Sequence, residues 1–314
     1  MNMPMMIRYL HLVLWPILFL VLACGGAPVN PTPEVSHPAM KQLQKGVGLY
    51  QRGCFQASLD AFTKAHELFT AADLLPGVAM SLNNIGNVYR YIGDSPSALL
   101  FFEEAYEIYI RLDDRDGAIQ ALSNKAAVLI QNDRLDAAEN TLNAAETMAG
   151  ASGKIVAHVL NNKGILLMRR QQYDAAEFIL QEALGATATE NLHGSATIYS
   201  SLGNLMAEKA DYETARKLYE KALDLDRQSG FHPGLADNLK AIGKVCRQQG
   251  LYAQTTDYLQ RSVKIYAILG NREQVKDIMT MLEESAARAN IDLTMTRHFV
   301  HKWSNGQISG HPCP

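Results

Sequence analysis

Cysteine and histidine are the residue types here that could bind a metal or form covalent bonds, and both are scarce. The cysteines are Cys24, Cys54, Cys246 and Cys313. The best metal-ligand spacing is His298-x-x-His301 ahead of Cys313, but no cysteine pair or acidic partner accompanies it. The chain has no P-loop, dinucleotide-binding glycine loop or HExxH motif. We therefore expect no catalytic residue, no metal, no other cofactor and no small-molecule substrate.

Cys24 directly follows an apolar segment. Residues 10–23 are apolar except for His11, and such a run is shorter than the ~20 residues that span a bilayer. The sequence Val21-Leu22-Ala23-Cys24 resembles a lipobox, in which the cysteine becomes the acylated N-terminus. The resemblance implies a lipoprotein signal peptide over 1–23 and, because Gly25 and not Asp follows, a bacterial outer-membrane anchor facing the periplasm. An ordinary cleaved signal and an uncleaved anchor are the alternatives.

A repeat of about forty residues organises the rest of the chain. Small residues recur at spacings of 40, 40, 38, 39 and 40, at Gly46, Gly86, Ala126, Gly164, Gly203 and Gly243. Each is followed sixteen residues later by a large apolar residue: Phe62, Phe102, Leu142, Leu180, Tyr219 and Leu259. Small residues allow two helices to cross closely, and we expect the large residue to fill the space between repeats.

This pattern resembles the tetratricopeptide repeat over residues 40–289. The resemblance implies an all-α fold, a right-handed superhelical solenoid of about six helix pairs. Residues 272–289 form one more amphipathic pattern, which we interpret as a capping helix. The ~40-residue unit, with phrases such as LNNIGNVY (82–89), resembles the Leu-Gly-Asn-repeat and kinesin-light-chain branch.

The segments on either side of the solenoid are expected to be extended or loosely held. Residues 24–39 contain four prolines and read as a tether from the lipidated cysteine. Residues 290–314 show no sustained period, which predicts a disordered or loosely docked tail. Cys54 and Cys246 lie five repeats apart, too far for a disulfide, so we expect two separate thiols and a third, Cys313, in the tail.

One polar position recurs on the first helix of the first five repeats, two residues before the small residue, and the sixth repeat has Ala241 there. This polar column consists of Gln44, Asn84, Asn124, Asn162 and Ser201. A carboxamide both donates and accepts, so it can pair with the backbone of an extended peptide, and in the resembling branch an asparagine ladder does so. The remaining candidates for a peptide-binding groove are Asn87, Asn204, Arg90, Arg169 and Lys244. The alternative is that the asparagines bond neighbouring helices or face water.

Charge and motifs together favour an interaction protein. With 29 Lys and Arg against 32 Asp and Glu, the net charge of -3 gives no basic surface for nucleic acid. We predict a membrane-anchored adaptor that binds an extended peptide or helix of an envelope partner in its concave groove. The resemblance makes a role in pilus, secretion or envelope-complex assembly plausible. The alternative is a fixed structural subunit of an envelope complex without peptide exchange.

Overall fold

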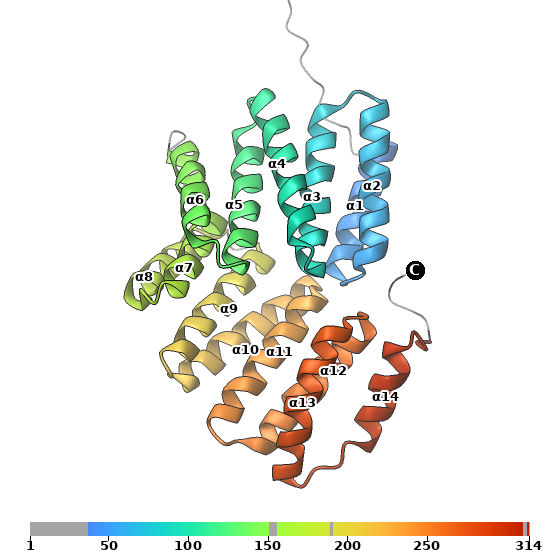
Figure 1. The fold of residues 1–314 in the computed structure, drawn as a ribbon, viewed down its shortest axis with the longest axis vertical. Helices are drawn as coiled ribbons and strands as arrows, with labels where there is room; N and C mark the ends of the chain where they lie inside the picture. Colours follow the sequence, from blue (N-terminus) through green and yellow to red (C-terminus); the bar gives the residue numbers. More distant parts are fainter. Residues whose placement is uncertain (1–36, 151–155, 189–190, 310–312, 314) are drawn as a thin grey trace, which may run out of the picture.

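The computed structural model describes residues 37–150, 156–188, 191–309 and 313, and in these ranges the regular elements are all helices (Figure 1). The first three helix pairs are α1 (Pro38–Gln51) with α2 (Phe55–Ala71), α3 (Leu75–Ile92) with α4 (Ser95–Arg111), and α5 (Arg115–Gln131) with α6 (Leu135–Gly150). The next three are α7 (Ala157–Arg169) with α8 (Tyr173–Gly185), α9 (Leu192–Glu208) with α10 (Tyr212–Ser229), and α11 (His232–Gln248) with α12 (Tyr252–Ile268). Helices α13 (Arg272–Ala289) and α14 (Thr294–Ser304) follow.

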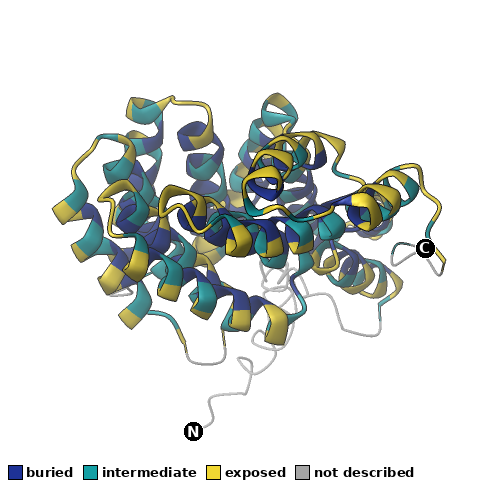
Figure 2. Ribbon diagram, turned by 90° about the horizontal axis from the view of Figure 1, so that it is seen from below, coloured by how far each residue is buried: buried dark blue, intermediate teal, exposed yellow. Residues whose placement is uncertain are grey.

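The predicted all-α solenoid of six helix pairs and a capping helix is confirmed. From α1 to α13 each helix packs against the next one along the chain, and each odd-numbered helix from α1 to α9 also contacts the next odd-numbered helix. The odd-numbered helices therefore form one layer and the even-numbered helices another. Figure 2 shows the buried residues on the helix faces that meet and the exposed residues on the outer turns.

The small and large residues of the repeat meet inside each helix pair. A Cβ placed on Gly46 would lie 2.5 Å from the ring of Phe62, and one on Gly86 would lie 2.7 Å from the ring of Phe102. The expectation that the large residue fills the space between repeats is wrong in this respect. Its side chain fills the crossing within its own repeat, because the glycine leaves room for a ring there.

A second close approach joins successive repeats. A Cβ on Gly77, in the first turn of α3, would lie 2.3 Å from the ring of Phe69 in α2. Gly117 has the same relation to Tyr109 in the following repeat, at 2.4 Å. The glycines near the start of the odd-numbered helices therefore set how closely one repeat stacks on the one before it.

Local signals fix where several helices begin. The carboxylates of Asp94, Asp114 and Asp211 accept hydrogen bonds from backbone N–H groups three residues on, at 3.1, 2.9 and 3.2 Å. These are N-caps, which satisfy backbone donors that have no partner in the first turn. Asp94 and Asp211 lie in turns between the two helices of a repeat, and Asp114 lies in the turn that joins one repeat to the next.

The C-terminal segment is more ordered than its sequence suggests. Residues 294–304 form α14, which packs against α12. Leu293 and Val300 are buried in the same apolar cluster as Ile278 of α13, and Trp303 packs at its edge. The prediction of a disordered or loosely docked tail is therefore wrong for this part of 290–314. One short apolar face, too brief to give a sequence period, is enough because α12 and α13 supply the matching surface.

The solenoid curves until its two ends face each other. In Figure 1, α12–α14 lie below α1 and α2. Cys54 and Cys313 form a disulfide with Cα atoms 5.1 Å apart. The expected separate thiol at Cys54 and loose thiol at Cys313 are thus corrected, while Cys246 is a buried free cysteine.

The membrane-related predictions lie outside the described residues. The signal peptide 1–23, the lipidation site Cys24 and nearly all of the tether 24–39 precede residue 37. Among the residues that are described, no helix combines the length and apolar character needed to cross a bilayer.

Candidate functional site

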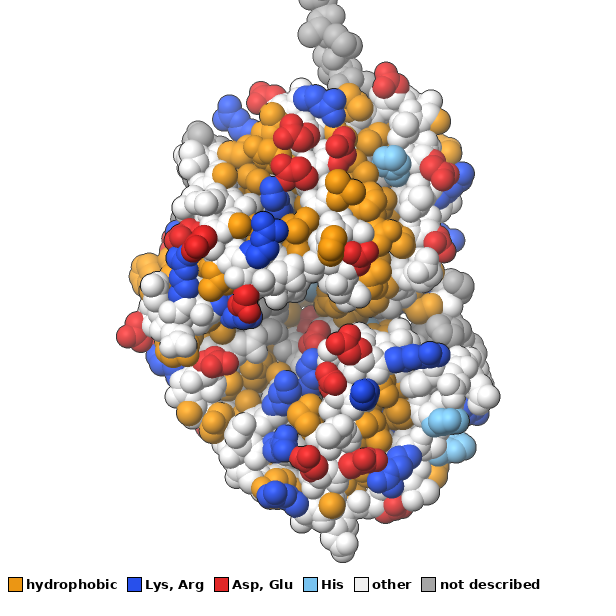
Figure 3. Space-filling view, in the orientation of Figure 1, with side chains coloured by type: hydrophobic (Ala, Val, Ile, Leu, Met, Phe, Trp, Pro, Cys, Tyr) orange, Lys and Arg blue, Asp and Glu red, His pale blue; other side chains and the backbone are white. Residues whose placement is uncertain are grey.

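The polar column lies on the layer of odd-numbered helices, one residue per helix. The two ends of the solenoid meet through Tyr50 of α1, Tyr91 of α3 and Phe231, which caps α11. Because residues of this layer contact one another across the closure, the layer faces inward. Figure 3 shows the surface hollowed where the two halves of the molecule face each other. The predicted groove residues are therefore carried by the inner layer.

Two asparagines of the column connect neighbouring helices. Asn124 of α5 donates from Nδ2 to Oδ1 of Asn83 in α3, at 3.0 Å. Asn162 of α7 donates to the backbone oxygen of Ser123 in α5, at 2.9 Å. These carboxamides hold the odd-numbered helices in register, so part of their hydrogen-bonding capacity is already used.

The other polar candidates make local contacts. Asn84 and Asn87 donate to backbone oxygens four residues earlier, at 2.8 and 3.2 Å. Ser201 is 4% exposed and donates to Thr197, also one turn earlier. Asn204 accepts a hydrogen bond from the Tyr219 hydroxyl at 2.7 Å, and Gln44 is exposed. The polar column therefore continues along the inner layer, but its members differ in how many hydrogen-bonding groups remain free to bind a ligand.

The candidate cations divide into two groups. Arg169 forms an ion pair with Asp133, as Arg247, the residue of the sixth repeat that follows Cys246, does with Glu284 at 2.6 Å. By contrast, Arg90 lies with its guanidinium carbon 5.6 Å from the centre of the Tyr91 ring, and its Nε is buried without a hydrogen-bond partner. Arg90 therefore differs from Arg169 and Arg247 in that it packs against the tyrosines Tyr50 and Tyr91, with its Nε enclosed.

Lys244 is exposed, but partial desolvation of its ammonium group disfavours the charged form. Burial, reinforced by the charge of Lys240, lowers the pKa of Lys244. Asp237 and Asp277 act in the opposite direction but more weakly. An additional anionic neighbour would therefore stabilise the charged form of Lys244.

Burial and a hydrogen bond perturb the tyrosines around the closure. Burial raises the pKa of Tyr50, and the neighbouring Arg90 opposes that rise. The pKa of Tyr91 is raised further, first by burial and then by the Asp237 carboxylate of α11. The hydroxyl of Tyr266 donates to the same Asp237. Residues of the first two repeats and of the sixth thus form one polar and aromatic cluster.

Asp226 is a buried carboxylate that the sequence analysis did not single out. It is 2% exposed, and Oδ2 accepts a hydrogen bond from Asn238 at 2.8 Å while Oδ1 has no partner. Nδ1 of His193 lies 3.8 Å from this Oδ1, beyond hydrogen-bonding distance. Burial is the main cause of the raised pKa of Asp226. The signal in the sequence is positional: Asp226 follows Tyr219 by seven residues, where Phe69 follows Phe62 in the first repeat.

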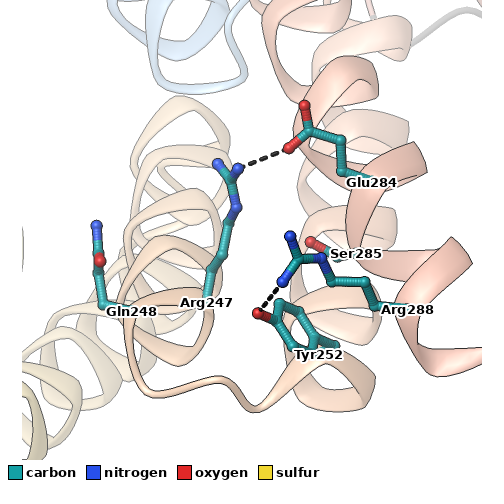
Figure 4. Close-up of a pocket in the computed structure, with 6 residues that line it drawn as sticks. All are labelled: Arg247, Gln248, Tyr252, Glu284, Ser285 and Arg288. Carbon is teal, nitrogen blue, oxygen red and sulfur yellow. Dashed lines mark hydrogen bonds and ion pairs between the residues drawn. The ribbon is translucent and has the colours of Figure 1, made fainter.

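A small polar pocket lies near the C-terminal end, with a volume of about 260 Å³. It is lined by Arg247, Gln248, Tyr252, Glu284, Ser285 and Arg288 (Figure 4). Arg247 bonds Glu284, and Arg288 donates to the Tyr252 hydroxyl, so both guanidinium groups point at partners within the pocket. We assign it a structural role between α11, α12 and α13.

The histidines of α14 do not assemble a metal site. His298 stacks edge-on against Phe299, and Nε2 of His301 lies 3.3 Å from Asn305. Within the described part of the chain, no three His, Cys, Asp or Glu side chains gather as a metal-binding group.

Sequence comparison identifies the repeats. Residues 39–111 and 194–267 match the tetratricopeptide repeat family. Together with the fold, this match shows that the chain carries tetratricopeptide repeats and forms a solenoid of that type. No curated protein matches the chain.

Solved structures agree on the fold. A Rap protein complexed with competence and sporulation factor matches 80% of this chain and 75% of its own, with 15% identity and a TM-score of 0.57. A signal-transduction ATPase with a tetratricopeptide repeat sensor, from Pyrococcus horikoshii, matches 88% of this chain with 15% identity and a TM-score of 0.56. This chain spans 42% of that protein's length. The apo form of RapI matches 80% of this chain and 98% of its own, with 14% identity and a TM-score of 0.50.

Proposed function

We propose that this protein is a lipid-anchored adaptor of the bacterial envelope that binds an extended peptide or helix of a partner protein on its inner layer. The observation that carries the proposal is the inner layer itself, where polar side chains recur once per repeat from α1 to α9. Such a surface can pair with the main chain of a ligand while neighbouring side chains select its sequence. The Rap protein complexed with competence and sporulation factor is a structural precedent.

Arg90 and Lys244 add charge to that surface. Arg90 keeps a buried Nε without a partner, and burial disfavours the charge of Lys244. An acceptor or anionic group of a bound segment would reach Lys244, which is exposed, and would stabilise its charged form. The repeat length and the LNNIGNVY phrase favour the Leu-Gly-Asn-repeat and kinesin-light-chain branch for this way of binding.

Three features support the envelope location. The apolar segment 10–23 precedes Cys24 in a lipobox-like sequence, and a proline-rich stretch separates Cys24 from α1. The Cys54–Cys313 disulfide is the third feature, because structural disulfides persist mainly in oxidising compartments such as the periplasm. On this proposal the lipid holds the solenoid at the outer membrane, and the protein serves the assembly of a pilus, secretion or other envelope complex without catalysing a reaction.

The alternative function is a fixed structural subunit without peptide exchange. The observation that favours it is the use of Asn124 and Asn162 in hydrogen bonds between helices. If their role is to keep the helices in register, a partner would dock elsewhere on the solenoid.

Groove variants distinguish the two functions. The change is Asn84→Ala, Asn124→Ala and Asn162→Ala in one chain, with crosslinking and mass spectrometry in the native envelope as the measurement. We expect the adaptor to lose its partner. Recovery of the same partner at the same level would refute peptide binding on the inner layer and support the fixed subunit.

Two controls keep this test interpretable. Asn140→Ala with Asn143→Ala changes two exposed asparagines on α6 and should leave the partner in place. Asn84→Ala alone removes a carboxamide whose hydrogen bond lies within its own helix. It should weaken binding of the partner without loosening the packing between helices. Thermal unfolding of each variant checks that the fold is kept.

Lipid attachment has its own test. Globomycin should cause a prolipoprotein to accumulate, and Cys24→Ser should abolish acylation. Mature-size protein without lipid under both conditions would rule out the lipoprotein assignment.

A further inference from the structure

The two ends of the solenoid meet in a closure contact, which we define by Tyr50, Tyr91, Phe231 and Gly53. The ring of Phe231 lies 6.1 Å from that of Tyr50 and 6.0 Å from that of Tyr91, between centroids. Gly53 lies in the turn between α1 and α2, where a Cβ would be 2.8 Å from Leu269. A few side chains thus bring the first two repeats against α11 and the end of α12.

The disulfide joins the same two ends covalently. Cys54 is the N-cap residue of α2, 3% exposed, and packs with Leu49 and Ala61 of the first repeat. Cys313 is only partly buried and follows α14, which is packed on α12. The bond therefore links two well-packed units that are 259 residues apart in sequence.

Most other helix contacts in the molecule are between neighbours along the chain. Helices α1 to α4 and α11 to α14 share no extensive helix-to-helix packing across the described residues. Each aromatic pair adds only modest stability beyond its buried area. A covalent link keeps such a limited contact closed by holding its two sides at high effective concentration.

We infer that the Cys54–Cys313 disulfide is a site of thiol–disulfide exchange whose reduction by a dithiol opens the ring of repeats. Opening separates the closure contact and exposes the inner faces of α1, α3 and α11 to solvent. The inference concerns access to the inner layer and does not depend on what binds there.

The burial of the two sulfurs sets the direction of exchange. The incoming thiolate attacks Sγ of Cys313, because Cys54 is enclosed by the first repeat. A bond forms between the reductant and Cys313, the bond to Cys54 breaks, and the Cys54 thiolate takes up a proton. The second thiol of the dithiol then attacks the mixed disulfide and releases Cys313. Two electrons and two protons pass to the chain, and the dithiol becomes a disulfide.

Hydrogen exchange tests the opening. The full chain, purified in detergent, is compared with and without dithiothreitol by mass spectrometry. We expect amides at the closure-facing ends of α1, α3 and α11 to exchange about tenfold faster or more after reduction, with α5 to α8 unchanged. Cys313→Ala should behave like the reduced protein without any reductant.

Cys246 provides the matched control. It is a buried cysteine outside the disulfide, so Cys246→Ala should respond to dithiothreitol as the unaltered chain does. Equal exchange at the closure in the oxidised chain, the reduced chain and Cys313→Ala would overturn the inference, because the closure would then hold without the bond.

A trapping experiment tests the site of attack. The probe is a thioredoxin-type dithiol protein whose second active-site cysteine is replaced by serine, so that the mixed disulfide cannot resolve. Peptide mapping should find the probe on Cys313. A mixed disulfide on Cys54, or none after prolonged incubation, would contradict the proposed exchange.

Discussion

The glycine at each helix crossing gives a quantitative prediction for Gly86→Ala. The new methyl would lie 2.7 Å from a carbon of the Phe102 ring, against an ordinary carbon contact of about 3.5–4.0 Å. Phe102 is fully buried, so its ring has no solvent to move into. Overpacking of this kind costs about 1–3 kcal/mol, whereas alanine in a helix gains up to about 1 kcal/mol over glycine. We expect a net loss of up to about 2 kcal/mol.

Gly48→Ala separates the two contributions. Gly48 also lies in a helix, but apart from the nearby backbone of that helix no atom would come within 4 Å of a Cβ placed there. This variant should therefore gain about 0.5–1 kcal/mol from helix propensity alone. Urea unfolding followed by circular dichroism measures both variants under the same conditions.

The third repeat suggests how to rescue Gly86→Ala. It carries Ala126 where the second repeat has Gly86, and Leu142 where the second has Phe102. Combining Gly86→Ala with Phe102→Leu should therefore recover part of the loss. A double-mutant cycle should give a coupling of about 1–2 kcal/mol. Absence of coupling, or stabilisation by Gly86→Ala equal to that of Gly48→Ala, would refute the steric explanation.

Three further predictions concern charged groups. Burial lowers the pKa of His158 from 6.5 to about 4, so the unfolded chain binds a proton that the folded chain excludes. The free energy of unfolding should therefore fall by about 1.5 kcal/mol from pH 6.5 to 5. His158→Gln should remove that loss, as measured by urea unfolding at pH 6.5 and at pH 5. Burial raises the pKa of Asp226, so its contribution is favourable below the ordinary value of 3.8 and is lost as pH rises through the folded-state value. Asp226→Asn should thus raise the melting temperature at pH 8 but not at pH 3, and an equal change at both would contradict this. Arg170 bridges Asp136 and Glu139, so Arg170→Gln should cost about 0.5–1 kcal/mol at low salt and little at 1 M salt, measured by urea unfolding.

The sequence could predict the repeats because their cause is local. Gly86 and Phe102 are sixteen residues apart and touch within one helix pair, so the steric requirement returns with every repeat. N-caps such as Asp94 and Asp211 act over three residues and are equally visible. Six helix pairs and a capping helix follow from such short-range rules.

The closure could not be predicted from the same rules. Where the ends of a solenoid come to lie depends on small rotations summed over all its repeats, and no single window of sequence contains that sum. Cys54 and Cys313 are therefore neighbours in space without any periodic signal that relates them. The helix at 294–304 is hard to predict for a related reason. Its short apolar face is stabilised only because α12 packs against it.

The candidate site was predictable in place but not in detail. The position of the polar column on one helix layer follows from the repeat register. Whether a given side chain is available to bind a ligand depends on its neighbours. Asn162 of α7 bonds Ser123 of α5, and Arg169 bonds Asp133. Arg90 differs from Arg169 only in the partners that the fold places around it.

The disulfide also determines how the molecule responds to mechanical tension. A pull applied to the two ends of the chain passes along it to Cys54, crosses the bond to Cys313, and bypasses everything between them. The bypassed chain of 259 residues would extend about 900 Å if it were free to unravel. While the bond is intact only α1 and its flanking residues can be drawn out, so repeats two to six are shielded from stretching at the chain ends.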